Sequence, residues 1–214
     1  MKFIGHLDMM RYFQKAIRRA DIDVAYSEGF SPHQKISFAS PLGVGLLSQG
    51  EYFDMEVYSV MPSKDAVEAF NNVMVEGVEV LSYRLLPDDA KNGMSIIAAA
   101  DYLIHFSDNH PFVSKDDISA FMNQSEITVL KKTKKSEKEV DIRPLILDID
   151  LIDNDLFMKV IAGSAENLKP ELVLEAMSNY FSRVIPYYVT ERLEMYAKVD
   201  GRYISLEYLG NDVE

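Results

Sequence analysis

Two histidines in the first 40 residues are the side chains best suited to acid–base chemistry. His6 opens a predicted helix, and His33 lies in a stretch rich in serine and proline. Histidine titrates near neutral pH, so either residue could act as an acid, a base or a metal ligand. The competing interpretations are a helix-start residue that bonds the backbone and an exposed loop histidine. No His-x-His or His-x-x-x-His spacing occurs, and we therefore expect no metal site within this chain.

Serine hydroxyls surround His33 in the sequence, at positions 27, 31, 37 and 40. A hydrolytic triad needs an exposed nucleophile, a base and an orienting acid, but the Gly-x-Ser-x-Gly pattern is absent. The glycines of residues 41–50 match neither a Walker A nor a Rossmann pattern. They can form either a nest of backbone N–H groups for an anion or simply a wide turn. This region therefore indicates binding rather than catalysis, and we expect no cofactor.

Basic and aromatic residues interleave in the same region, which is typical of proteins that bind single-stranded RNA through stacking and phosphate contacts. Further along, Asp141 and Arg143 alternate with apolar residues on a predicted strand. They indicate either a cross-strand ion pair or a site for an anion or a partner. The candidate ligand- or RNA-binding residues are His6, Arg11, Arg18, Ser27, Phe30, His33, Lys35, Ser37, Glu51 and Arg143.

The charge of the chain is unevenly distributed. The net charge is −12, which argues against non-specific nucleic-acid binding. Residues 1–50, however, contain six Lys/Arg against four Asp/Glu, and a second basic cluster lies in residues 131–138. A local basic face on an acidic body suits an anionic ligand bound at one place, whereas a solvated, salt-bridged surface is the alternative.

The chain has no cysteine, which excludes disulfides, thiolate zinc sites and iron–sulfur ligation by its own residues. This composition fits a cytoplasmic location. No apolar run approaches the roughly 20 residues that a membrane span needs, so we expect no membrane partner.

Residues 1–88 are expected to form one domain. Apolar residues near a 3.6-residue period predict a helix over residues 6–20, and alternation predicts strands over 24–26, 35–39 and 51–58. A second helix, N-capped by Ser63, is predicted to end at Gly77, and a strand over 78–86 follows. This order, (β)αββαβ with the first strand short or absent, is the ferredoxin-like arrangement.

Residues 95–199 are expected to form a second ferredoxin-like domain, separated from the first by the polar connector 87–94. Strands are predicted over 98–106, 126–132, 140–150, 156–163 and 191–199, with a hairpin tip at 134–138. Helices are predicted over 115–123, N-capped by Ser114, and over 169–181. Residues 200–214 are expected to be a terminal extension. The predicted fold class is α+β, with two ferredoxin-like units whose antiparallel sheets carry helices on one face.

Several motifs of the chain are similar to those of a known family. They are Gly5-His-Leu-Asp-Met-Met-Arg11, Ala16-Ile-Arg-Arg-Ala20, Tyr26-Ser-Glu-Gly-Phe-Ser-Pro-His-Gln-Lys-Ile-Ser-Phe38, Ser48-Gln-Gly-Glu51 and Asp141-Ile-Arg-Pro144. They closely resemble the radical-SAM-linked proteins, a bacterial family of undetermined function. The resemblance implies a radical-SAM protein as the partner, encoded nearby or fused, and it implies RNA metabolism through neighbouring genes. It transfers no catalytic residue.

Relatives in that family usually carry a strand before the Phe3-Ile-Gly-His element. The resemblance therefore implies that the first strand of the N-terminal sheet is truncated in this chain. A sheet that lacks a central strand has unpaired backbone groups. Another segment or a partner chain is then expected to complete the sheet.

Three functions fit these observations. The first is a non-catalytic RNA-binding or substrate-presenting subunit in RNA modification or processing. The second is a protein-interaction module that docks the radical-SAM partner, which the acidic body favours. The third, and least favoured, is a metal-independent RNA phosphodiesterase in which His6 and His33 act as acid and base while Lys35 and Arg11 hold the phosphate.

Overall fold

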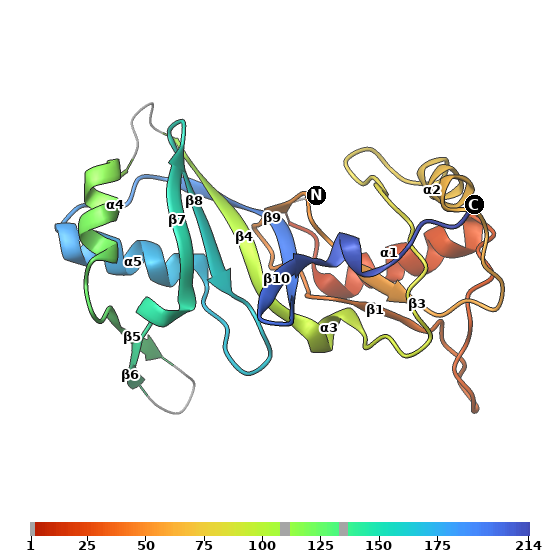
Figure 1. Cartoon of the computed structure of the whole chain (residues 1–214). Helices are drawn as coiled ribbons and strands as arrows, with labels where there is room; N and C mark the ends of the chain where they lie inside the picture. Colours follow the sequence, from red (N-terminus) through yellow and green to blue (C-terminus); the bar gives the residue numbers. More distant parts are fainter. Residues whose placement is uncertain (1–2, 108–111, 133–136) are drawn as a thin grey trace. The chain divides into compact units, whose positions relative to one another are not determined.

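Contacts divide the chain into two compact units in the computed structural model, which describes residues 3–107, 112–132 and 137–214 (Figure 1). Unit 1 consists of Met1–Gly45, Glu51–Ile97 and Tyr196–Glu214. Unit 2 consists of Leu46–Gly50 and Ala98–Met195. Residues 200–214, expected as a terminal extension, are thus part of unit 1.

The first helix of unit 1, α1 (His6–Arg19), confirms the helix predicted over residues 6–20. Its buried face consists of Phe13, Ala16 and Ile17. An acidic residue lies in its first turn and two arginines lie in its last turn, which complements the helix dipole. The opposite face of α1 is left to solvent, and this is the face that carries its cations.

A two-stranded antiparallel ribbon of β1 (Ile36–Phe38) and β3 (Phe53–Met55) packs against α1. Phe38 and Phe53 form an aromatic cluster with Phe13 of the helix, with ring centroids 5.0–5.6 Å apart. Both strands are shorter than predicted. The predicted strand over 24–26 is present only as isolated bridges, from Val24 to Val57 and from Tyr26 to Gln34.

The second helix, α2 (Ser63–Asn71), contributes Phe70 to a core that also contains Ile17 and Ile22 of the α1 region. The prediction that Ser63 is the N-cap is wrong by one position, because the N-cap of α2 is Pro62. The Ser63 hydroxyl instead accepts the backbone N–H of Val213 at 2.8 Å.

The strand predicted over residues 78–86 is wrong. The hydrogen-bond partners of this segment are not neighbouring strands of a sheet. The side-chain amide of Asn71 donates to the Val80 carbonyl and accepts the Val80 N–H. Leu85 forms an isolated bridge to Asn211. The backbone groups of Val80 and Leu85 are therefore satisfied without a sheet.

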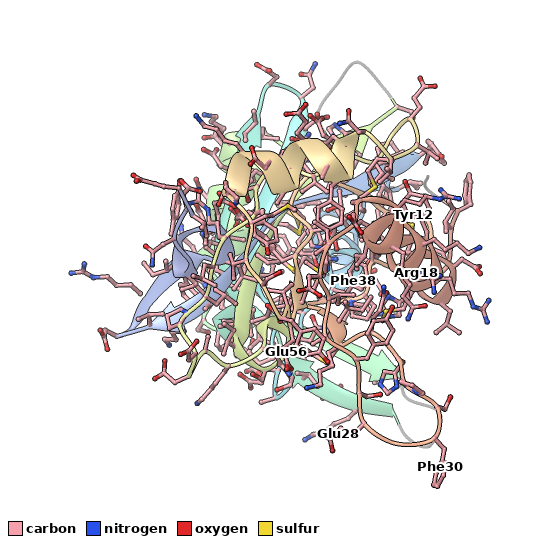
Figure 2. All side chains as sticks on the ribbon, turned by 90° about the vertical axis from the view of Figure 1, so that its right-hand side faces the viewer. Tyr12, Arg18, Glu28, Phe30, Phe38 and Glu56 are labelled. Carbon is pink, nitrogen blue, oxygen red and sulfur yellow. The ribbon has the colours of Figure 1, made fainter. Side chains whose placement is uncertain are left out.

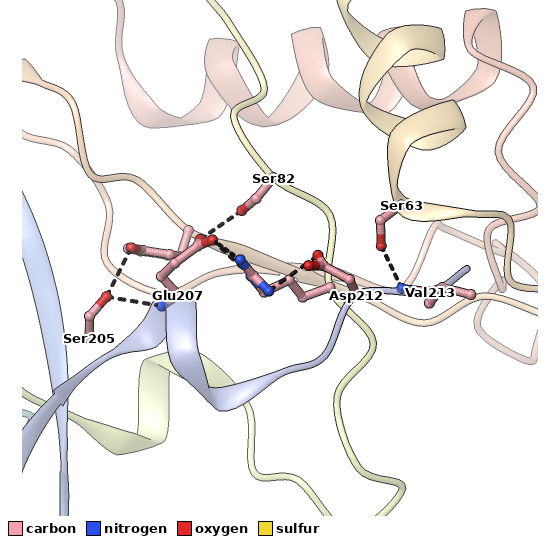
Figure 3. A network of polar contacts seen from close by, with 8 residues as sticks. Ser63, Ser82, Ser205, Glu207, Asp212 and Val213 are labelled. Carbon is pink, nitrogen blue, oxygen red and sulfur yellow. Dashed lines mark hydrogen bonds and ion pairs between the residues drawn. The ribbon is translucent and has the colours of Figure 1, made fainter.

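The C-terminal segment of unit 1 comprises β10 (Arg202–Ser205) and η2 (Leu206–Leu209) and is held by a polar network (Figure 3). Arg84 donates to Glu207 at 2.7 Å and to Asp212 at 3.2 Å. The Ser82 hydroxyl donates to the other carboxylate oxygen of Glu207 at 2.7 Å. A short helix, α3 (Gly93–Ile96), completes the unit.

Unit 2 contains an antiparallel sheet in the order β9-β4-β8-β7, and the α+β class is confirmed. The strands are β4 (Ile97–Phe106), β7 (Ile146–Ile152), β8 (Asp155–Ile161) and β9 (Tyr188–Val199). The helices α4 (Lys115–Met122) and α5 (Pro170–Phe181) lie on the same side of this sheet (Figure 1). The connection that contains α4 runs from β4 to β7 and passes over β8. The connection that contains α5 runs from β8 to β9 and passes over β4. The Ser114 N-cap is confirmed, because its hydroxyl accepts the Asp117 N–H within a complete capping box.

A separate antiparallel hairpin of β5 (Thr128–Lys132) and β6 (Glu137–Asp141) lies between α4 and β7. The single strand predicted over 140–150 is wrong, because the 3-10 turn η1 (Arg143–Leu145), which contains Pro144, separates β6 from β7. Of the predicted tip at 134–138, residues 134–136 lie outside the described residues. Among those described, none of the helices has the length and the apolar run that crossing a bilayer requires.

The glycine-rich stretch of residues 41–50 contributes one short strand, β2 (Leu47–Ser48), which pairs in parallel with Glu191 and Arg192 of β9. Gly50 lies two residues after this strand, against the β9 backbone. A Cβ at this position would be 2.3 Å from the Leu193 carbonyl oxygen. This close approach explains why a residue without a side chain occupies position 50.

Candidate binding surface

A hairpin projects from unit 1 and carries Phe30 at its tip (Figure 2). The bridge between Tyr26 and Gln34 closes it. Inside the loop, the Ser27 hydroxyl lies 2.8 Å from Nδ1 of His33 and accepts the His33 backbone N–H at 3.1 Å. The Ser27 N–H in turn donates to the His33 carbonyl at 2.8 Å. Ser27 and His33, both predicted site residues, therefore contact each other and stabilise the conformation of the loop.

Phe30 is wholly exposed at the end of this hairpin, at 111% of its reference area. Gly29 has a φ of +105°, a conformation that L side chains rarely adopt, and it lets the chain reverse just before Phe30. An aromatic ring that is held in water contributes no buried area to the fold. A single exposed apolar residue is ordinary in itself, so the significance of Phe30 depends on what surrounds it.

Lys35 lies at the base of the hairpin and forms a two-oxygen contact with Glu56, with Nζ–O distances of 2.8 and 3.0 Å. This hydrogen bond raises the pKa of Lys35. Both side chains are largely exposed, so the contact adds little stability. Glu56 also offsets most of the positive charge that Lys35 could offer a ligand.

Ser37 lies on the outward face of β1, opposite Asp54 of β3. Burial raises the pKa of Asp54, although the carboxylate accepts the Gly93 N–H at 2.6 Å. A shallow hollow of about 290 Å³ follows this face of the ribbon. Its lining residues are Lys35, Ile36, Ser37, Asp54, Met55 and Glu56.

Four cations form a basic stripe along the exposed face of α1, defined here as Arg11, Lys15, Arg18 and Arg19. The first three are spaced by four and three residues and therefore lie above one another on the helix. Arg11 has an exposed ion pair with Asp8 at 3.4 Å. In the part of the chain that the structure describes, no ion pair engages Lys15, Arg18 or Arg19. The stripe thus presents largely uncompensated positive charge.

The basic stripe meets the hairpin at a hollow of about 390 Å³. Arg18 lines it from the helix, and Tyr26 lines it from the first arm of the hairpin. The other lining residues are Asp21, Ile22, Asp23 and Val24. Arg18 of the basic stripe and Tyr26 of the hairpin therefore border the same hollow of unit 1.

His6 and His33 are not brought together. The His6 ring packs edge-on against Phe38, with the centroids 5.5 Å apart, whereas His33 bonds Ser27 in the loop. Phe38 follows His33 by five positions of mostly extended chain, which corresponds to roughly 16 Å. An acid and a base that act on one phosphodiester have to reach the same group. This arrangement favours binding over chemistry.

The two remaining candidates are Glu51 and Arg143. Glu51 is exposed just before β3. Arg143 lies in unit 2, where its Nε donates to the Met122 carbonyl at 2.9 Å. The neighbouring Asp141 carboxylate accepts the backbone N–H groups of Ile127 and Arg143. Both side chains of the Asp141–Arg143 pair therefore support local backbone structure.

Sequence patterns did not single out His105, which links three strands of unit 2. Its Nδ1 lies 2.6 Å from Asp155 of β8, and its Nε2 lies 3.1 Å from Glu191 of β9. Glu191 also accepts the side-chain amide of Gln49, next to β2. Burial lowers the pKa of His105, but the hydrogen bonds and charges of Glu191 and Asp155 together outweigh this effect and raise it. The partners lie 50 and 86 residues away, so no local pattern could indicate them.

The stability of unit 2 should therefore fall as His105 loses its proton. A histidine with a raised pKa stabilises the fold below its unfolded pKa of about 6.5, and this contribution is lost as the pH rises through the folded pKa. Replacing His105 by Asn should flatten the dependence of the unfolding free energy on pH above 6. Because the side chain is 36% exposed, screening limits the difference to about 1 kcal/mol. Urea unfolding between pH 6 and 9 measures it; parallel curves for both proteins would contradict the assignment.

Comparison with known protein families finds a match over most of the chain. A family model described as an uncharacterized protein conserved in bacteria covers residues 1–170. No curated protein and no solved structure matches the chain. The matched residues include α1, the hairpin and the ribbon.

Proposed function

The chain belongs to the DUF2344 family of uncharacterised proteins conserved in bacteria, and we propose that it is a non-catalytic subunit that binds single-stranded RNA through unit 1. The observation that carries the proposal is the fully exposed Phe30 on a hairpin that adjoins the basic stripe. Stacking on aromatic rings combined with phosphate contacts is the usual way in which proteins hold single-stranded RNA. The acidic remainder of the chain restricts such binding to this surface.

The geometry of the histidines supports a role in binding rather than in cleavage. His33 is engaged with Ser27, whereas His6 packs on Phe38, so the two histidines make separate contacts. The subunit would then hold RNA for an enzyme that acts on it. From the resemblance to radical-SAM-linked proteins, we propose a radical-SAM protein as that enzyme, acting in RNA modification or processing in the cytoplasm.

A protein partner is the second candidate for the same surface. Phe30 and Leu7, which begins the exposed face of α1, are 111% and 69% exposed. Large exposed apolar residues are typical anchors of protein interfaces. Under this alternative the hairpin docks the radical-SAM partner directly, and RNA binding would be absent.

Replacing Phe30 by Ala tests the proposal. Base–aromatic stacking contributes about 1–3 kcal/mol, so the variant should bind a single-stranded RNA 12-mer roughly 5- to 150-fold more weakly. Fluorescence anisotropy at low salt measures the affinity. Replacing Tyr208 by Ala, which removes another exposed aromatic ring of unit 1, should leave the affinity unchanged. A wild-type protein that fails to bind RNA at low salt would refute the proposal, and co-purification of the partner, lost in the Phe30 variant, would then favour protein docking.

A further inference from the structure

Gln34 carries a side-chain amide that is buried without a hydrogen-bond partner. The residue is 4% exposed, and among the described residues neither Oε1 nor Nε2 has a partner. Burying an unpaired amide is unfavourable, and most buried polar groups in proteins are paired. An aliphatic side chain of similar size at this position would therefore suit the fold better. The stability of the fold therefore does not explain why an amide occupies this position, which suggests a role in binding.

The position of Gln34 connects it to the hollow at the end of the basic stripe. Gln34 is directly opposite Tyr26 in the antiparallel bridge, so the two side chains lie on the same face of the hairpin. Tyr26 is partly exposed and lines the hollow together with Arg18. Gln34 itself does not line this hollow of about 390 Å³, but its cross-strand neighbour Tyr26 does.

These three groups match the three parts of a nucleotide. A glutamine amide offers a donor beside an acceptor, which pairs with the amine and ring nitrogen on the N6/N7 edge of adenine. A tyrosine ring provides a stacking surface, and an arginine binds phosphate. The carboxylates of Asp21 and Asp23 also line the hollow, and Asp23 accepts the Ser59 hydroxyl at 2.7 Å. They disfavour phosphate on their side, which leaves the phosphate to Arg18.

We propose that Arg18, Tyr26 and Gln34 form a site for one unstacked nucleotide of the bound RNA, with a preference for adenine. This inference rests on the proposed RNA binding and specifies which base unit 1 recognises. Because solvent does not reach the amide in the free protein, the base has to displace the groups that cover it. Tyr26, partly exposed and opposite Gln34, is the residue expected to move.

The test compares the wild-type protein with the Gln34→Leu variant on ten-residue oligo(A), oligo(U) and oligo(C), by fluorescence anisotropy. The wild-type protein should bind oligo(A) roughly 5- to 150-fold more tightly than oligo(U). The variant should lose this preference and keep the affinity for oligo(U). The free variant should also melt at a higher temperature, because the unpaired amide is gone. Gln34→Met serves the same comparison if the leucine variant does not fold.

Gln124→Leu is the matched control. The Gln124 amide in unit 2 donates to the Phe121 carbonyl at 2.9 Å, so its loss should lower the melting temperature and leave the oligo(A) preference intact. A Gln34→Leu variant that keeps the preference, or that melts at a lower temperature than the wild type, would overturn the inference. Equal binding of all three RNAs by the wild type would overturn it while the proposed function stands. Absence of any RNA binding would overturn both.

Discussion

Replacing all four cations of the basic stripe by glutamine is expected to weaken RNA binding about 10²- to 10³-fold at 0.1 M salt. Each neutralised phosphate of a single strand contributes about 0.7 to the slope of log K against log salt, so four contacts contribute about 2.8. At 0.1 M salt this slope corresponds to roughly 600-fold in affinity. The substituted residues are Arg11, Lys15, Arg18 and Arg19, all exposed on α1. Glutamine is a good helix former, so the helix should persist.

A second quadruple variant with the same change in net charge is the control. It replaces four exposed cations of unit 1 outside the stripe by glutamine, namely Lys64, Lys91, Lys198 and Arg202. Its affinity should remain within a few-fold of the wild type, since only long-range attraction is reduced. Equal losses in both variants would show that net charge, rather than the stripe, drives binding.

The largest expected effect on stability comes from replacing Gly50 by Ala. The added Cβ would lie 2.3 Å from the Leu193 carbonyl oxygen and 2.8 Å from the Glu194 Cα. These are backbone atoms within β9, so the contact can be relieved only if the β2 segment or the strand moves. We expect a loss of about 3 kcal/mol, the upper part of the range for overpacking. At about 2–4 °C per kcal/mol for a chain of this size, the melting temperature should fall by about 6–12 °C.

Gly5→Ala is the matched control for this prediction. A Cβ at Gly5 would meet its nearest neighbour, Asp8 Oδ2, at 3.9 Å, an ordinary contact. Gly5 is the N-cap of α1, where alanine is somewhat worse than glycine, so a loss of about 1 kcal/mol or less is expected. Urea unfolding of both variants makes the comparison. A Gly50 variant as stable as the Gly5 variant would show that residues 46–50 do not pack on β9 in this way.

The parts of the fold that follow from local patterns could be predicted from the sequence. The helices α1, α4 and α5 have clear apolar periodicity, and Ser114 with Asp117 gives α4 a capping box. The segment 78–86 has an equally apolar sequence but is not a strand. Its partners are a side chain of α2 and a tail more than 120 residues away, held through Arg84 and Glu207. Alternation shows that a segment is extended, but it does not show what the segment pairs with.

In the candidate surface too, local contacts could be predicted from the sequence, whereas long-range contacts could not. Ser27 and His33 are six residues apart across a turn, and their contact follows from local structure. The pairing of Lys35 with Glu56 requires the β1–β3 register, which the sequence does not reveal. Gln34 is not among the predicted site residues, although it alternates with the inward Ile36 and Phe38, and this period marks it as an inward polar residue. A polar residue on the apolar side of a strand is the signal that could have identified it.

Photo-crosslinking of bound RNA tests whether unit 1 binds RNA through the hairpin and α1, because it locates the contact on the protein. A single-stranded RNA carrying 4-thiouridine would be irradiated in complex with the wild-type protein, and the crosslinked peptides would be identified by mass spectrometry. Crosslinks are expected within the hairpin of residues 26–34, at Phe30 above all, and along the exposed face of α1. Crosslinks confined to unit 2, with none in the hairpin or in α1, would contradict this expectation.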